Sequence, residues 1–186
     1  MIPPVGRPRI ELRACGSERA FADKVLGCLE PWFKIDREVT GTHPFGQRLR
    51  IDAVLQPLDD ADWHDPNPAF GVEFKQAPQH TRDSMRLAAQ ALDYTYVDWV
   101  SYGRLGVFMC TPGPGAFPIE GTESRYLVRL LGQFCVGELG YFARRNETDN
   151  GGGWALRIHG DHTLWSQDIG AYEAKRRTIR PKVGSR

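Results

Sequence analysis

Three ionisable residues stand in apolar stretches whose composition favours β-strands. Glu73 and Lys75 lie in FGVEFK (residues 70–75), and Asp52 lies upstream in RLRIDAVL (residues 48–55). Because side chains alternate along a strand, Glu73 and Lys75 share one face while their apolar neighbours share the other. An unpaired charge in such a strand is costly, so this face is either wet or part of a site. If the two strands are neighbours, Asp52 and Glu73 converge.

Two converging carboxylates form a hard-oxygen site that suits Mg²⁺, an ion that keeps several waters and takes few protein ligands. An ammonium group beside them can orient or deprotonate a metal-bound water and can stabilise charge on a phosphoryl group. Asp52, Glu73 and Lys75 are therefore candidates for a metal site whose chemistry acts on water and a phosphoryl group. The competing interpretation of Glu73 and Lys75 is a solvated strand face with an ordinary cross-strand ion pair.

The elements that must position these residues alternate between helices and strands. Apolar residues recur at helical spacing after Ser17, a candidate N-cap, until Pro31. Residues 32–39 and 48–55 predict an antiparallel hairpin, and residues 70–76 predict a third strand. The later predicted elements are a helix over residues 81–100, a strand over 103–110, a helix over 123–136, strands 138–145 and 153–159 as a hairpin, and a strand over 162–167. This order predicts an α/β fold with a mixed sheet.

The arrangement of Asp52, a loop and then Glu73-x-Lys75, all after a first helix, resembles the PD-(D/E)xK nuclease superfamily. On the helix after the third strand, Gln90 and Tyr94 match the Q-x-x-x-Y motif of its RecB-like and lambda-exonuclease-like branch. Four residues apart, the two side chains share one helical face. The resemblance covers residues 17–110. The sequence departs from the family pattern at Ile51, which precedes Asp52 where the motif has a proline.

The resemblance implies a restriction-endonuclease-like core, with a mixed central β-sheet flanked by helices. It implies a metal-dependent deoxyribonuclease, an exonuclease or structure-specific endonuclease in DNA repair, recombination or phage or mobile-element metabolism, whose product carries a 5′-phosphate. The alternative is a non-catalytic DNA-binding module that retains the fold. The implied ion is Mg²⁺, with Mn²⁺ as a substitute, and the cysteine ligands of the iron–sulfur members are missing. The implied metal ligands are Asp52, Glu73, the Phe74 backbone carbonyl and Glu18.

The implied supporting roles have simpler alternatives. Lys75 would position or activate water, while Gln90 and Tyr94 would support the site from the long helix, with Leu92 and Tyr96 turned toward the core. Buried polar residues also occur simply because they satisfy backbone groups. Glu18 follows the N-cap, where a carboxylate stabilises a helix without any metal.

The basic residues are unevenly distributed, although the net charge is only +1. Residues 175–186 contain no acid and form a basic tail after a single predicted domain over residues 1–174. Such a tail is either a solvated end or a source of phosphate affinity. The candidate DNA contacts are Arg82, Arg86, Lys175, Arg176, Arg177 and Arg180.

The four cysteines are widely spaced and form no C-x-x-C pair, which favours reduced thiols and no iron–sulfur cluster. His159 and His162 flank Gly160 and Asp161, a pattern typical of a turn rather than of a zinc site. We expect a cytoplasmic protein, since neither a signal peptide nor a membrane-spanning run is evident. The sequence leaves homodimerisation open.

Overall fold

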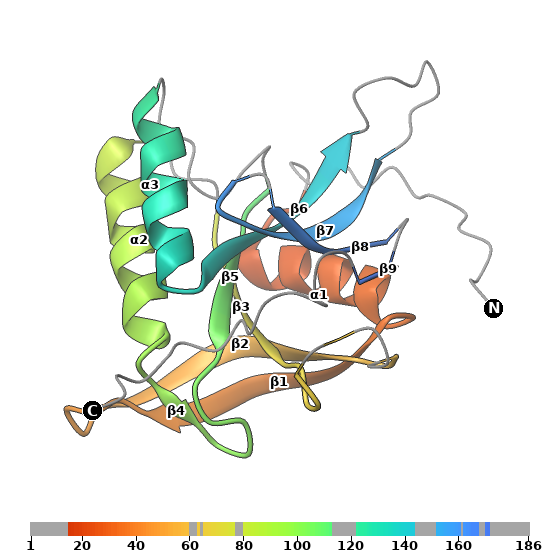
Figure 1. The fold of residues 1–186 in the computed structure, drawn as a ribbon, viewed down its shortest axis with the longest axis horizontal. Coiled ribbons are helices and arrows are strands. Elements are labelled where there is room, and N and C mark those ends of the chain that lie inside the picture. The colour runs from red at the N-terminus through yellow and green to blue at the C-terminus, as the bar shows by residue number, and fades with distance from the viewer. Residues whose placement is uncertain are drawn as a thin grey trace.

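One mixed β-sheet organises the part of the chain that the computed structural model describes, which is residues 15–59, 63, 65–76, 80–112, 122–143, 152–160, 162–167 and 170–171. Three helices and nine strands lie within it (Figure 1). The helices are α1 (Glu18–Leu29), α2 (Thr81–Tyr94) and α3 (Thr122–Gln133). In sheet order, the strands are β4 (Asp98–Trp99), β1 (Phe33–Thr42), β2 (Arg48–Pro57), β3 (Phe70–Phe74), β5 (Gly106–Cys110), β6 (Val136–Ala143), β7 (Gly152–Ile158), β8 (His162–Ser166) and β9 (Gly170–Ala171).

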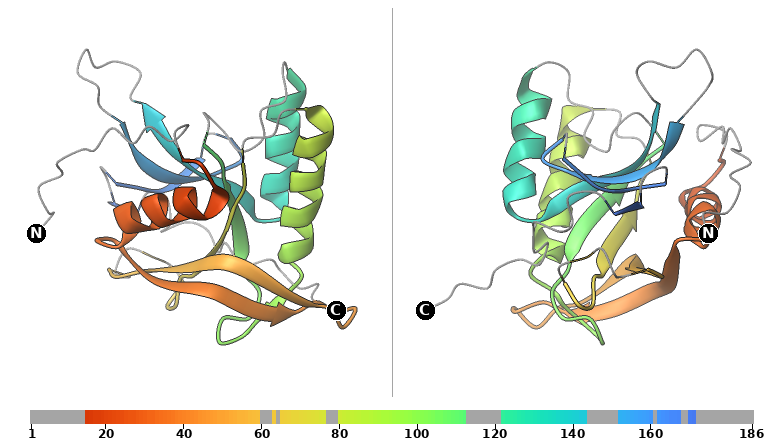
Figure 2. Two further views of the ribbon diagram at one scale, coloured as in Figure 1. Left: turned by 180° about the vertical axis from the view of Figure 1, so that it is seen from behind. Right: turned by 45° about the vertical axis from the view of Figure 1, so that its right-hand side comes forward.

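The centre of the sheet is parallel and its two flanks are antiparallel. β3, β5 and β6 run parallel, and the chain crosses between them through α2 and α3. These two helices lie side by side on one face of the sheet, while α1 covers the opposite face (Figure 1 and Figure 2). The α/β class with a mixed sheet between helices is thus confirmed. None of the described helices is both long and apolar enough to cross a membrane.

Two apolar clusters occupy the two faces of the sheet, and they identify the face of each central side chain. The cluster against α1 includes Val72 and Phe74 of β3 together with Phe108 of β5. The cluster against α2 and α3 includes Val107 and Met109 of β5. Glu73, which lies between two residues of the first cluster, therefore projects toward the α2 face.

The first helix begins and ends where the sequence predicts. The Ser17 Oγ accepts a hydrogen bond from the Ala20 amide at 3.1 Å, so one of the unpaired N–H groups of the first turn is satisfied. Phe21, Val25 and Leu29 are buried along one stripe. The helix ends two residues before the proline at position 31, as expected for a residue that cannot continue an α-helix.

The predicted helix over residues 81–100 is too long. α2 ends at Tyr94, and Asp98–Trp99 form a short strand against β1 instead. The reason is tertiary: Trp99 packs where Gly41 lacks a side chain, since an added Cβ there would lie 2.7 Å from the indole ring. Tyr96 is therefore exposed (43%) and does not turn toward the core, contrary to the helical prediction.

Candidate active site

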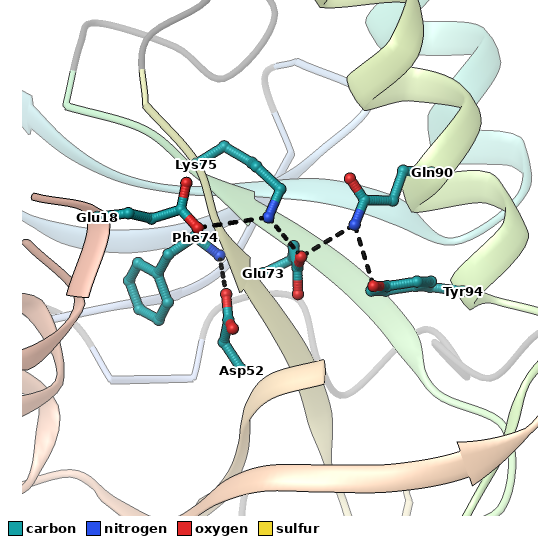
Figure 3. Close-up of polar contacts among 7 residues, drawn as sticks. All are labelled: Glu18, Asp52, Glu73, Phe74, Lys75, Gln90 and Tyr94. Carbon is teal, nitrogen blue, oxygen red and sulfur yellow. Dashed lines mark hydrogen bonds and ion pairs between the residues drawn. The ribbon is translucent and has the colours of Figure 1, made fainter. Parts of the chain in front are cut away.

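Asp52 lies where β2 separates from β3. The described β2–β3 ladder ends at the pair Ala53–Val72, while β2 continues its pairing with β1. Beyond that point the Phe74 amide donates a hydrogen bond to the Asp52 Oδ2 at 2.8 Å (Figure 3). On the other side of β2, strand β1 is also irregular: Glu38 has a left-handed φ of 53°, and the β1–β2 ladder has no pair at Asp52. A side-chain carboxylate thus takes the place that a backbone carbonyl occupies in a regular ladder, which fixes Asp52 at the end of β3.

The Glu73 carboxylate is buried and only partly satisfied. Its Oε1 accepts hydrogen bonds from Lys75 Nζ at 2.6 Å and from Gln90 Nε2 at 3.0 Å. Its Oε2 is also buried but has no hydrogen-bond partner in the described structure. Buried polar atoms are normally paired, because an unpaired one loses its hydration without compensation. One oxygen of Glu73 therefore remains available to a ligand.

Lys75 connects the buried carboxylate with the first helix. Its Nζ lies 3.6 Å from the Glu18 Oε1, and both side chains are partly exposed (Figure 3). Its backbone amide donates to the Cys110 carbonyl at 3.0 Å, which holds this residue beside β5 just after β3 ends. The ammonium group thus lies between Glu73 and Glu18, at the rim of the cluster.

Gln90 and Tyr94 contact the cluster from α2. The Gln90 Nε2 donates to the Tyr94 Oη at 3.0 Å in addition to its bond with Glu73. The two side chains stand about one turn apart on the same helical face, as their four-residue spacing requires. The Tyr94 ring also packs edge-on against Trp99 at a centroid distance of 5.5 Å. The short strand β4, which follows the end of α2, therefore fixes the position of Tyr94 through Trp99.

The electrostatics of the cluster follow from burial and from an excess of carboxylates. Burial, assisted by the nearby Asp52 charge, raises the pKa of Glu73 to about 7, although Lys75 and, to a smaller extent, the backbone of Asp52 oppose the rise. Burial alone would lower the pKa of Lys75, but its hydrogen bond to Glu73 and the charges of Glu73, Glu18 and Asp52 raise it. Lys75 therefore holds its proton as an ammonium group. Three carboxylates face one ammonium group, an arrangement that attracts a further cation.

The donor atoms at the site suit a hard cation with few protein ligands. No group of three or more His, Cys, Asp or Glu side chains that could hold a metal occurs in the described part of the chain. Glu18 approaches the cluster only through Lys75, which leaves Asp52 and Glu73 as the adjacent pair of carboxylates. Mg²⁺ is commonly held by one or two carboxylates plus substrate phosphate and water. The unpaired Glu73 Oε2 fits such a site.

The remaining sequence predictions concern α2, a pair of histidines and the basic tail. Arg82 and Arg86 are exposed on α2. The rings of His159 and His162 lie 5.8 Å apart at the turn between β7 and β8, with no metal-binding group in the described residues there. Lys175, Arg176, Arg177 and Arg180, together with the boundary after residue 174, lie outside the described residues.

A second pair of charged residues lies on the face of Glu73, and the sequence analysis missed it. Glu138 on β6 and Arg157 on β7 are cross-strand partners within otherwise apolar strands. The signal was present in GWALRIH, where an arginine interrupts an apolar strand much as Glu73 interrupts FGVEFK. Its meaning depends on the strand order, which places β6 beside β5.

Comparisons with known proteins do not supply a family. No protein-family model, curated protein or solved structure matches this chain.

Proposed function

We propose that the cluster around Glu73 is the active site of a Mg²⁺-dependent deoxyribonuclease with a restriction-endonuclease-like core. The observation that carries this proposal is the buried Glu73 carboxylate, which has one unpaired oxygen between Asp52 and Lys75. A structural ion pair would satisfy both oxygens, because an unpaired buried acceptor is destabilising. A cation held between Glu73 and Asp52 would satisfy this oxygen.

The chain offers distinct roles for its residues in this reaction. Asp52, Glu73 and the Phe74 carbonyl would hold Mg²⁺ (Mn²⁺ as a substitute), and Glu18 would assist. The bound ion would supply Lewis-acid polarisation of the phosphodiester and neutralise its charge. Lys75, whose raised pKa keeps it protonated, would orient water or a phosphoryl oxygen as a hydrogen-bond donor. Gln90 holds the Glu73 carboxylate in place through its amide and is itself held by Tyr94.

DNA is the proposed substrate because of the resemblance of Asp52, Glu73-x-Lys75 and Gln90-x-x-x-Tyr94 to the PD-(D/E)xK nucleases. Their convergence at one point adds support, since residues from two strands and a helix meet there (Figure 3). A non-catalytic module would have no need of an ammonium group against a buried carboxylate. The whole carboxylate–lysine–glutamine network is therefore better explained by chemistry than by binding alone.

The test is a nuclease assay on linear, circular, single-stranded and branched DNA with Mg²⁺, Mn²⁺ or EDTA. We expect metal-dependent cleavage that Lys75→Ala abolishes, with DNA affinity changed by less than about threefold because affinity is spread over many basic groups. The matched control is Lys34→Ala, an exposed lysine on β1 that should leave cleavage unchanged. Metal-independent DNA binding without cleavage of any substrate would support the non-catalytic module instead. Equal loss of binding and cleavage in Lys75→Ala would contradict the role given to Lys75.

A further inference from the structure

A row of paired residues crosses the sheet from the proposed active site toward β7. Glu73 pairs with Met109, Met109 pairs with Glu138, and Glu138 pairs with Arg157. Directly paired residues project from the same face of a sheet. Arg157 therefore lies on the same face as Glu73, three strands away, which corresponds to about 14 Å at the usual strand spacing.

Arg157 is held in a defined position by an aromatic ring. Its guanidinium carbon lies 3.5 Å from the centroid of the Phe142 ring. That ring leans over Gly140, where an added Cβ would meet its tip at 3.0 Å, so the glycine makes room for the stacked pair. Stacking on an aromatic face leaves the edge of the planar guanidinium free to donate hydrogen bonds.

Within the part of the chain that the structure describes, the Arg157 guanidinium makes no hydrogen bond or ion pair, and its Nε is buried without an acceptor. Burial lowers its pKa, and only the charge of Glu138 opposes this effect. A partly desolvated guanidinium without an acceptor is costly, so the arrangement calls for an anionic ligand. The planar fork of arginine matches the geometry of phosphate oxygens.

We propose that Arg157, backed by Phe142, binds a phosphate of the DNA strand beyond the phosphodiester that is cleaved. This inference rests on the proposed nuclease function, since it assigns the ligand as part of that substrate. Arg157 is then a positioning residue: it holds the strand through this phosphate and takes no part in the chemistry at Glu73. Met109, which lies between the two positions, is fully buried, so the DNA would span the two sites without lying on the sheet between them.

The test measures DNA affinity against salt concentration, in EDTA, for a fluorescently labelled oligonucleotide in single-stranded and duplex form. Arg157→Gln should weaken binding about tenfold, as expected for a charge-assisted hydrogen bond. It should also reduce the slope of log affinity against log salt by ~0.7 on a single strand and ~0.9 on a duplex. Arg157→Lys should keep the slope but bind several-fold less tightly, because it lacks the fork. Phe142→Leu should weaken binding at an unchanged slope, since it removes no charge.

The matched control is Arg104→Gln, which removes another arginine that lies over an aromatic ring, Tyr96, before the opposite end of β5. Its affinity and slope should stay near those of the wild type. If Arg157→Gln behaves like Arg104→Gln, the phosphate contact does not exist. If a thermal melt shows that Arg157→Gln does not fold, the Arg157→Lys and Phe142→Leu variants test the phosphate contact in its place.

Cleavage kinetics separate this inference from the proposed function. In an active wild-type protein, Arg157→Lys should raise KM on a long strand and leave kcat unchanged. If the wild type cleaves DNA but Arg157→Gln keeps the wild-type salt slope of DNA binding, the inference is overturned and the nuclease proposal stands. DNA binding with the reduced slope, but no cleavage by the wild type, would overturn the nuclease proposal alone. A wild type that neither binds nor cleaves DNA would overturn both.

Discussion

The substitution Glu73→Gln should stabilise the protein at alkaline pH in the absence of metal. Burial and Asp52 raise the pKa of Glu73 from an ordinary 4.5 to about 7 in the folded state. Between these two values the folded state keeps a proton that the unfolded state has lost, so the unfolding free energy falls as the pH rises through this window. The loss amounts to ~3 kcal/mol, since each unit of pKa corresponds to about 1.4 kcal/mol. Glutamine resembles the protonated carboxyl, so it avoids most of this loss.

The gain in unfolding free energy from Glu73→Gln should be roughly 1 to 3 kcal/mol at pH 8 and near zero at pH 4.5. It stays below the full loss at pH 8 because the new amide N–H₂ group takes the place of the unpaired Oε2. The assay is chemical denaturation in EDTA at several pH values, with the difference between variant and wild type isolating this one group. Glu38→Gln, which changes an exposed glutamate on β1, is the matched control and should show a flat difference. Saturating Mg²⁺ at pH 8 should stabilise the wild type but not Glu73→Gln. A variant that is less stable than the wild type at pH 8 would refute the reasoning.

Further predictions concern the helix, the tail and the short strand. Gln90→Ala should lower turnover about tenfold or more while the unfolding free energy changes by less than ~1 kcal/mol, as measured by kinetics and denaturation, because it loosens a hydrogen bond of Glu73. Removal of residues 175–186 should weaken DNA binding more at low salt than at high salt, and an unchanged salt slope would mean that the tail makes no phosphate contact. Gly41→Ala should destabilise the fold by about 1 to 3 kcal/mol in thermal or chemical unfolding, because its Cβ would collide with Val97 and Trp99. Because Trp99 also packs against Tyr94, turnover below the melting temperature should fall as well.

Local periodicity was sufficient to predict which candidate residues share a face, while the resemblance to a nuclease family singled out Gln90 and Tyr94. Alternation put Glu73 and Lys75 on one strand face, and the four-residue helical spacing put Gln90 and Tyr94 on one helix face. These are short-range relations that the chain geometry imposes. Their meeting point required only that consecutive elements pack against each other, as they do in most domains.

Long-range relations could not be read in the same way. The segment after Tyr94 satisfies a helical pattern, and only the space beside Gly41 on a distant strand gives Trp99 a better position. Arg157 was passed over because the sequence does not reveal that β6 continues the parallel part of the sheet. Without that order, a hairpin near the end of the chain has no visible relation to Glu73.

The hydrogen bond between Asp52 and the Phe74 amide makes the candidate site part of the sheet itself. In a site built only on loops, a ligand residue can be displaced while the scaffold remains closed. Here the carboxylate closes the seam between β2 and β3, so a local opening of that seam displaces the acid as well. Opening of the β2–β3 seam and loss of the proposed metal-binding geometry are then one event, and an ion that held Asp52 in place would also fasten these two interior strands together.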